Sequence, residues 1–156
     1  MEIKSGDLLF YKVTPQSNWI AKLIASVQIW RKEGTEAVSY SHVSIVSHDL
    51  NWQLEAHWPK TRLSPIDWTD PRIEVWRVKD ATACDIHGIL SWCYCNLDKP
   101  YDIGQILLGL FMWNNAYSCT EFVVKPFLLA DIDLAPNAGS FIAPNELITD
   151  KIERIR

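Results

Sequence analysis

The segment from residue 42 to residue 57 constrains the fold most, because it has the pattern of a β-hairpin. Residues 42–48 are mostly small or apolar, and residues 51–57 alternate polar with apolar side chains. Between them, Asp49 and Asn51 place turn-forming residues at both ends of a short connection. The pattern predicts two antiparallel strands, and therefore a sheet in which sequence neighbours pair with each other.

The rest of the chain extends this hairpin to an α+β order of elements. Two further strands are predicted, over residues 7–12 and 73–78. Helices are predicted over 17–30, from Asp80 or Thr82 to 96, over 102–113, and from Ser118 to a stop or kink at Pro126. The segment after Leu129 is rich in proline and aspartate and is predicted to be irregular.

Length and composition favour one compact domain. The 156 residues are 48% hydrophobic, enough for a single core, so we expect one domain over 1–156. A net charge of −4 with scattered basic residues argues against nucleic acid as a partner. The chain start lacks a signal-peptide pattern and no apolar stretch reaches the roughly 20 residues of a membrane span, so we expect a cytoplasmic or phage-associated protein without stable membrane insertion.

The four cysteines and four histidines are not spaced as a disulfide framework or a metal site. Cys93 and Cys95 have one residue between them, where redox and zinc motifs have two, and no histidine pair repeats at ligand spacing. We therefore expect no disulfides, no metal and no cofactor, and zinc bound by residues that only the fold brings together is the remaining alternative.

Cys119 is the residue to which a reactive role is most readily assigned. It follows Ser118, the predicted N-cap, and so occupies the start of a helix. Unpaired backbone N–H groups and the positive end of the helix dipole favour a thiolate there. His42, in the first strand of the hairpin, is the candidate base, and the backbone N–H of Cys119 is the candidate oxyanion donor. Tyr11, Tyr117 and Ser118 are weaker candidates for lining the oxyanion site or binding the substrate.

Strand alternation supplies a candidate third residue. Glu55 and His57 share one face of their strand, and Glu55 can lie beside His42 on the neighbouring strand. A carboxylate in that place would hold the imidazole in one tautomer and stabilise the imidazolium. Glu55 is therefore the favoured orienting residue, and His57 is its competitor.

Five short motifs follow one another along the chain: Gly6-Asp7-Leu8-Leu9-Phe10, Ser41-His42-Val43-Ser44-Ile45-Val46, Leu54-Glu55-Ala56, Tyr101-Asp102 and Ser118-Cys119-Thr120-Glu121-Phe122-Val123. In this order they resemble the circularly permuted NlpC-like cysteine hydrolases, the papain-like group that includes YiiX-like proteins and lecithin retinol acyltransferase relatives. The histidine precedes the cysteine here, as in the permuted branch. Departures from the common pattern are Ser44, where many members have glycine, and Phe122, where leucine is common.

The resemblance implies an α+β, permuted papain-like fold, with an antiparallel sheet or partial barrel packed against helices. It implies acyl transfer through a thioester on Cys119, with His42 as acid and base and Glu55 in the third position; acyltransferase relatives use a second histidine there, as His57 would be. A small peptide-like amide is the first expected substrate and an acylated lipid the second. A non-catalytic binding domain on the same scaffold is the remaining alternative, and the oligomeric state is left open.

Overall fold

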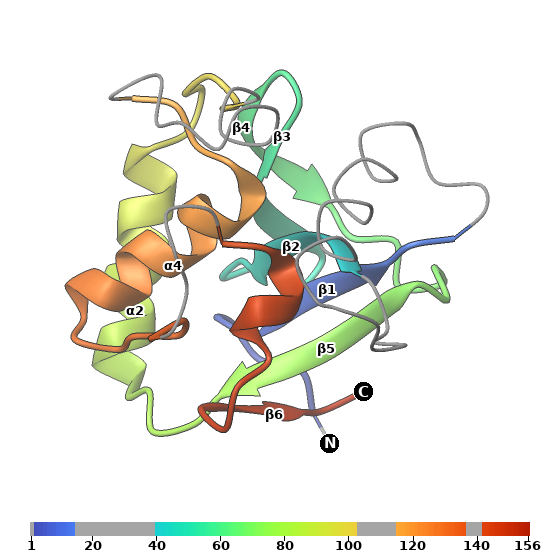
Figure 1. Ribbon diagram of the computed structural model, residues 1–156, viewed down its shortest axis with the longest axis vertical. Coiled ribbons are helices and arrows are strands. Elements are labelled where there is room, and N and C mark those ends of the chain that lie inside the picture. The colour runs from blue at the N-terminus through green and yellow to red at the C-terminus, as the bar shows by residue number, and fades with distance from the viewer. Residues whose placement is uncertain (1, 15–39, 103–114, 137–141) are drawn as a thin grey trace.

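Six strands form one open antiparallel sheet in the order β4-β3-β2-β1-β5-β6 (Figure 1). The computed structural model describes residues 2–14, 40–102, 115–136 and 142–156. Its strands are β1 (Leu8–Lys12), β2 (Tyr40–Val46), β3 (Trp52–His57), β4 (Lys60–Pro65), β5 (Ile73–Val78) and β6 (Ile152–Arg154). Two α-helices, α2 (Ala83–Cys95) and α4 (Cys119–Leu129), and the 3₁₀ helix η1 (Pro144–Leu147) complete the described elements.

The α+β class, the antiparallel sheet and the predicted hairpin are confirmed. β2 and β3 pair antiparallel, and the turn between them closes with a hydrogen bond from Trp52 N–H to the carbonyl of Asp49. The strands predicted over residues 7–12 and 73–78 are also present, as β1 and β5. The helices predicted over 17–30 and 102–113 lie outside the described residues, apart from Asp102 at the start of the second.

Both α-helices begin at an N-cap residue that the sequence pattern had proposed. Thr82, rather than Asp80, is the N-cap of α2 and forms a capping box with Asp85. Ser118 is the N-cap of α4, as predicted. Of the two alternatives predicted at Pro126, the stop is wrong, because α4 continues through this proline to Leu129, and the kink stays a prediction. A proline removes one backbone donor, and the buried apolar face of α4 holds the helix together beyond it.

Two strands were not predicted. β4 has a single large apolar residue, Leu63, and forms by pairing along the whole of β3. β6 lies in the segment expected to be irregular and pairs with the outer edge of β5. Each is an edge strand whose structure depends on a neighbour already in the sheet, so local sequence pattern is weak in both.

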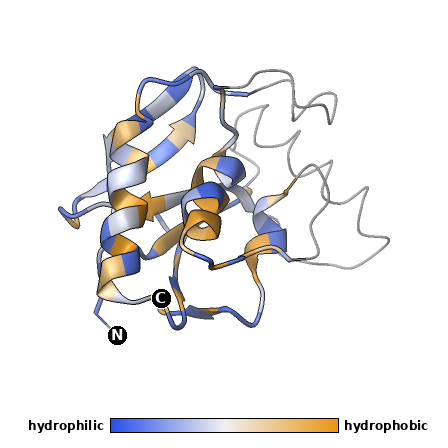
Figure 2. Cartoon of the chain, turned by 90° about the vertical axis from the view of Figure 1, so that its left-hand side faces the viewer, coloured by the Kyte–Doolittle hydropathy of each residue, from blue (hydrophilic) through white to orange (hydrophobic). Residues whose placement is uncertain are grey.

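The main core lies between the sheet and the helices. Alternate strand residues enter it from β1, β2 and β3: Leu8, Phe10, Val43, Ile45, Leu54 and Ala56. α2 contributes one side, through Ile89, Leu90 and Cys93, and the colours in Figure 2 change from hydrophobic to hydrophilic around the helices. A smaller cluster, made of Leu9, Val46, Ile66 and Val75, gathers the residues between these positions. On β2 and β3, His42 and Glu55 lie on the same face of the sheet as this smaller cluster.

The β2–β3 ladder is short, and this decides the shape of the site. It contains the pairs Ile45 with Leu54 and Val46 with Gln53. Beyond Ile45, in the described chain, side chains rather than backbone groups connect the two strands. Ser44 Oγ donates to Gln53 Oε1 at 2.5 Å, and the next contact along is between His42 and Glu55.

Candidate functional site

Cys119 is the first residue of α4 and is almost fully buried, with 3% of its surface exposed. Ser118 Oγ accepts a hydrogen bond from the Glu121 N–H at 3.3 Å, and the Glu121 carboxylate accepts one from the Ser118 N–H at 3.0 Å. This reciprocal cap fixes the first turn of the helix, at whose start the Cys119 N–H lies. Of the other cysteines, Cys93 is buried, with burial raising the pKa of its thiol, while Cys84 and Cys95 are exposed.

His42 lies between two groups that can carry negative charge. Its Nε2 is 2.6 Å from Glu55 Oε2, and it also hydrogen-bonds the Cys119 side chain. Burial disfavours the imidazolium, but the hydrogen bonds with Cys119 and Glu55 and the charge of Glu55 outweigh it and raise the pKa of His42 to about 10. Since Nε2 is bonded to Glu55, Nδ1 is the ring nitrogen available to Cys119.

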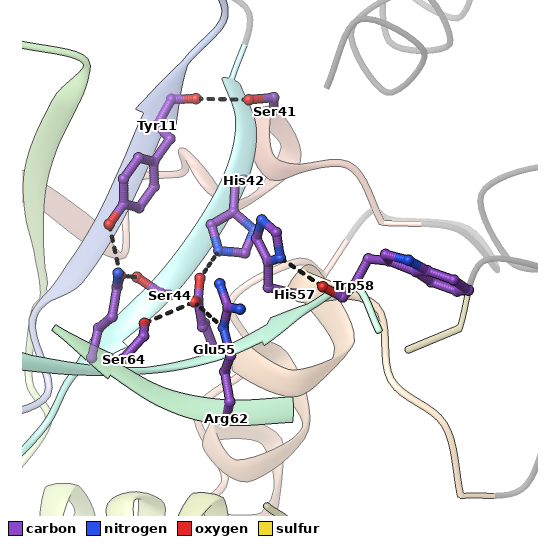
Figure 3. Close-up of polar contacts among 10 residues, drawn as sticks. Tyr11, Ser41, His42, Ser44, Glu55, His57, Trp58, Arg62 and Ser64 are labelled. Carbon is purple, nitrogen blue, oxygen red and sulfur yellow. Dashed lines mark hydrogen bonds and ion pairs between the residues drawn. The ribbon is translucent and has the colours of Figure 1, made fainter. Parts of the chain in front are cut away.

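Glu55 is a buried carboxylate whose two oxygens make polar contacts with His42, Arg62 and Ser64 (Figure 3). Oε2 faces His42, while Oε1 accepts hydrogen bonds from Arg62 Nε at 2.8 Å and Ser64 Oγ at 2.7 Å. Burial disfavours the charged form, but hydrogen bonding and charge from His42, with help from Ser64 and Arg62, hold the pKa of Glu55 well below its usual range. The group is therefore ionised at neutral pH.

His57 and Tyr11 contact the His42 ring without hydrogen-bonding it. The His57 ring meets it edge to face at a centroid distance of 5.7 Å, and His57 Nδ1 donates to the Trp58 carbonyl at 3.0 Å (Figure 3). Burial, together with the nearby positive charge of His42, lowers the pKa of His57 despite that hydrogen bond. The Tyr11 ring is 5.4 Å from His42, and its hydroxyl donates to Gln53 Oε1 at 2.7 Å. The structure therefore directs both polar groups away from His42.

The two tyrosines near Cys119 have different surroundings. Tyr117 donates its hydroxyl to Asn96 Oδ1 at 3.2 Å and packs its ring against Trp92 and Phe122. Tyr101 is the residue against the thiol: burial first, then charge and hydrogen bonding from Cys119, raise its pKa well above the ordinary value. Its hydroxyl also contacts the backbone of Cys119.

Sequence reasoning assigned no role to Tyr101, Arg62 or Ser64. Tyr101 lies in a recognised motif, so its place was visible but not its function. Arg62 and Ser64 belong to the unpredicted β4, where two polar residues two positions apart were the available signal for a shared strand face.

Within the four described stretches of chain, no group of three or more histidine, cysteine, aspartate or glutamate side chains is placed to hold a metal ion. The helices of those stretches also include none with the length and apolar character needed to cross a membrane.

Neither a known protein-family profile nor a curated protein sequence matches this chain. Among solved structures, the chain is similar to metalloprotein yiiX from Escherichia coli O157:H7, with a TM-score of 0.68. The match covers 98% of this chain and 96% of that one, at 14% sequence identity. At this identity the likeness concerns the fold alone.

Proposed function

We propose that this protein is a cysteine-dependent acyl hydrolase of the permuted papain-like, NlpC-like type, acting on a peptide-like amide. Cys119 is the nucleophile, His42 the general acid and base, and Glu55 the residue that orients His42. The observation that carries the proposal is the continuous chain of contacts from a helix-start thiol through one imidazole to a buried carboxylate. The order of the motifs and the likeness to yiiX support the same fold assignment.

The proposed reaction begins from a Cys119 thiolate beside protonated His42. Sγ attacks the substrate carbonyl carbon, a C–S bond forms, and the carbonyl electron pair moves to oxygen. The C–N bond then breaks as the leaving nitrogen takes the proton of His42, which gives a thioester and a free amine. Water next loses a proton to His42 and adds to the thioester carbonyl, and the C–S bond breaks to release the acid and the thiolate.

The raised pKa of His42 supports an amide as the first choice of substrate. An amine leaves only when its nitrogen is protonated, and the hydrogen bond and negative charge of Glu55, which raise the pKa of His42, favour a protonated imidazole for that step. Glu55 supports the same step, since it stays ionised beside the imidazolium.

The oxyanion of the tetrahedral intermediate would form next to two donors. One is the Cys119 N–H at the start of α4. The other is the Tyr101 hydroxyl, which lies at the same thiol and backbone and stays protonated because its pKa is raised. Tyr101 is therefore included in the proposed site.

Thiol reactivity tests the nucleophile without knowledge of the substrate. With iodoacetamide at neutral pH, we expect Cys119 to be alkylated much faster than Cys84, Cys93 or Cys95, as measured by peptide mass spectrometry over time. Cys84 and Cys95 are exposed, so accessibility alone would favour them and the comparison isolates chemical activation. Uniformly slow labelling of all four thiols would overturn the nucleophile assignment.

The Cys119→Ala variant extends this test to turnover on a panel of acyl amides and esters. We expect complete loss of hydrolysis with an unchanged circular dichroism spectrum, whereas Cys84→Ala, at an exposed helix position, keeps full activity. Turnover retained by folded Cys119→Ala would point to a water-based mechanism instead.

A further inference from the structure

We propose that Arg62 and Ser64, both on β4, are positioning residues that aim the Glu55 carboxylate at His42. This inference rests on the proposed function, and it assigns a role to the strand that lies beyond the hairpin. The relevant contacts are two hydrogen bonds to one oxygen of Glu55, which leave the other oxygen for the imidazole.

Sheet register explains why these two residues reach Glu55. In the β3–β4 ladder, Glu55 lies directly opposite Arg62, and Ser64 lies opposite Gln53. Residues opposite each other in an antiparallel pair share a face, and the diagonal neighbour two positions along is still within reach of a long side chain. Glu55 therefore meets Arg62 across the ladder and Ser64 on the diagonal.

The chemistry of a buried carboxylate explains why two donors are needed. Glu55 is 3% exposed, so an oxygen without a partner would carry the cost of lost hydration. With Oε1 held by Arg62 and Ser64, rotation of the carboxylate is restricted and Oε2 stays in line with His42 Nε2. A site group whose rotamer is locked by its neighbours keeps its working geometry between encounters with substrate.

Arg62 affects the pKa of His42 in two opposite ways, through its charge and through its hold on Glu55, so the two effects can be separated. The positive guanidinium repels a protonated His42, so neutralising it would by itself favour the imidazolium. Its side chain is 41% exposed, which weakens this repulsion through solvent screening. Loss of its hydrogen bond to Glu55 would instead disfavour the imidazolium, because the carboxylate would no longer be held in line with His42. Ser64 carries no charge, so only the positioning effect applies to it.

The titratable groups that face His42 come from four elements: Tyr11 on β1, Glu55 and His57 on β3, Arg62 on β4 and Cys119 on α4. A change confined to β4 leaves the other three elements as they are, so a shift in His42 can be traced to Arg62 or Ser64.

The experiment follows the His42 imidazole by NMR titration and the rate of Cys119 alkylation by iodoacetamide, in Ser64→Ala, Arg62→Lys and Arg62→Gln. We expect Ser64→Ala and Arg62→Lys each to lower the His42 pKa by about half a unit, as the loss of one hydrogen bond on a charged partner implies. Arg62→Lys retains the charge, so its shift reports the lost contact alone. We expect alkylation at neutral pH to slow by about fivefold in the same variants.

Arg77→Lys and Ser91→Ala are matched controls. Arg77 Nε donates to the buried Asp7 carboxylate at 2.7 Å, the same type of contact as in the Arg62–Glu55 pair, and Ser91 Oγ donates to a carbonyl within α2. Both variants should leave the His42 titration unchanged.

Glu55→Gln separates failure of this inference from failure of the proposed function. An unchanged His42 pKa in Ser64→Ala and Arg62→Lys, with a clear drop in Glu55→Gln, would overturn the positioning role and leave Glu55 in place. No drop in Glu55→Gln either would remove Glu55 from the site. If Ser64→Ala does not fold, Arg62→Lys decides the question, because the half-exposed Arg62 tolerates this change.

Discussion

At the scale of single residues, Glu55 and His57 are the two neighbours of His42 that could orient its imidazole ring. Glu55 approaches Nε2 at 2.6 Å with an ionised carboxylate, while His57 turns Nδ1 to the Trp58 carbonyl. His57 is therefore in ring contact with His42 without sharing a proton with it. These contacts favour Glu55 as the third residue of the proposed site.

Glu55→Gln and His57→Ala test this choice directly. We expect Glu55→Gln to fold, to lower kcat by about 10²-fold or more with little change in KM, and to lower the His42 pKa by removing a negative charge. His57→Ala should be much milder. Both variants would be assayed across pH on one acyl substrate, with circular dichroism as the folding control. A larger kcat loss in His57→Ala would give the orienting role to His57 and favour acyltransferase-like chemistry.

At the scale of elements, α4 is the part that presents the thiol, and its first turn depends on a capping box. Ser118 and Glu121 satisfy each other's backbone N–H groups, and the Thr120 hydroxyl donates to the Ile142 carbonyl at 2.6 Å. The direction of the Cys119 N–H and thiol follows from this local geometry. α2 begins with a capping box of the same type, at Thr82 and Asp85, but presents no site residue.

The two caps provide a paired prediction. We expect Ser118→Ala and Thr82→Ala each to lower the free energy of unfolding by about 1 kcal/mol, as loss of an N-cap usually does. Only Ser118→Ala should also slow alkylation of Cys119, because only α4 carries the thiol at its start. Urea unfolding and iodoacetamide kinetics measure the two effects. Equal slowing by both variants would mean that alkylation reports general loosening rather than the geometry of α4.

At the scale of the whole molecule, the sheet joins distant segments around two buried carboxylates. Glu74 on β5 accepts contacts from Lys12 on β1, Tyr40 on β2 and Arg154 on β6. Asp7, just before β1, forms a two-pronged pair with Arg77 on β5. Through Tyr40 and Lys12, Glu74 joins β2 and β1 to β5, and β2 carries His42.

Folding stability should depend on pH through His42. Its folded pKa of about 10 is above the ordinary 6.5, so the stabilisation is fully present below pH 6.5 and is lost as the pH rises toward 10. We expect the free energy of unfolding to fall over this range in the natural protein and to fall less in His42→Gln, as measured by urea unfolding at pH 6, 8 and 10. Parallel curves for the two proteins would show that His42 gains no proton affinity on folding.

Much of the fold was predictable because its signals are local. The hairpin over 42–57 is specified by alternation and turn formers, and the caps of α2 and α4 are specified by Thr82 and Ser118 with acidic residues three positions on. Alternation also placed Glu55 on the face where it meets His42. Cys119 was predicted as the nucleophile from its position at a helix start and from the order of the motifs, since sequence alone gives no distance between Cys119 and His42.

The sequence by itself determined the main strands, the capped helices and the residue types available for chemistry, because each depends on neighbours within a few positions. Tertiary structure decided the rest: β4 exists by pairing with β3, Tyr101 reaches the thiol of Cys119, and Arg62 and Ser64 close on Glu55. These contacts join segments with no shared local pattern. Their geometry arises from sheet register and from the packing of α4 on the sheet, which form only when the whole chain folds.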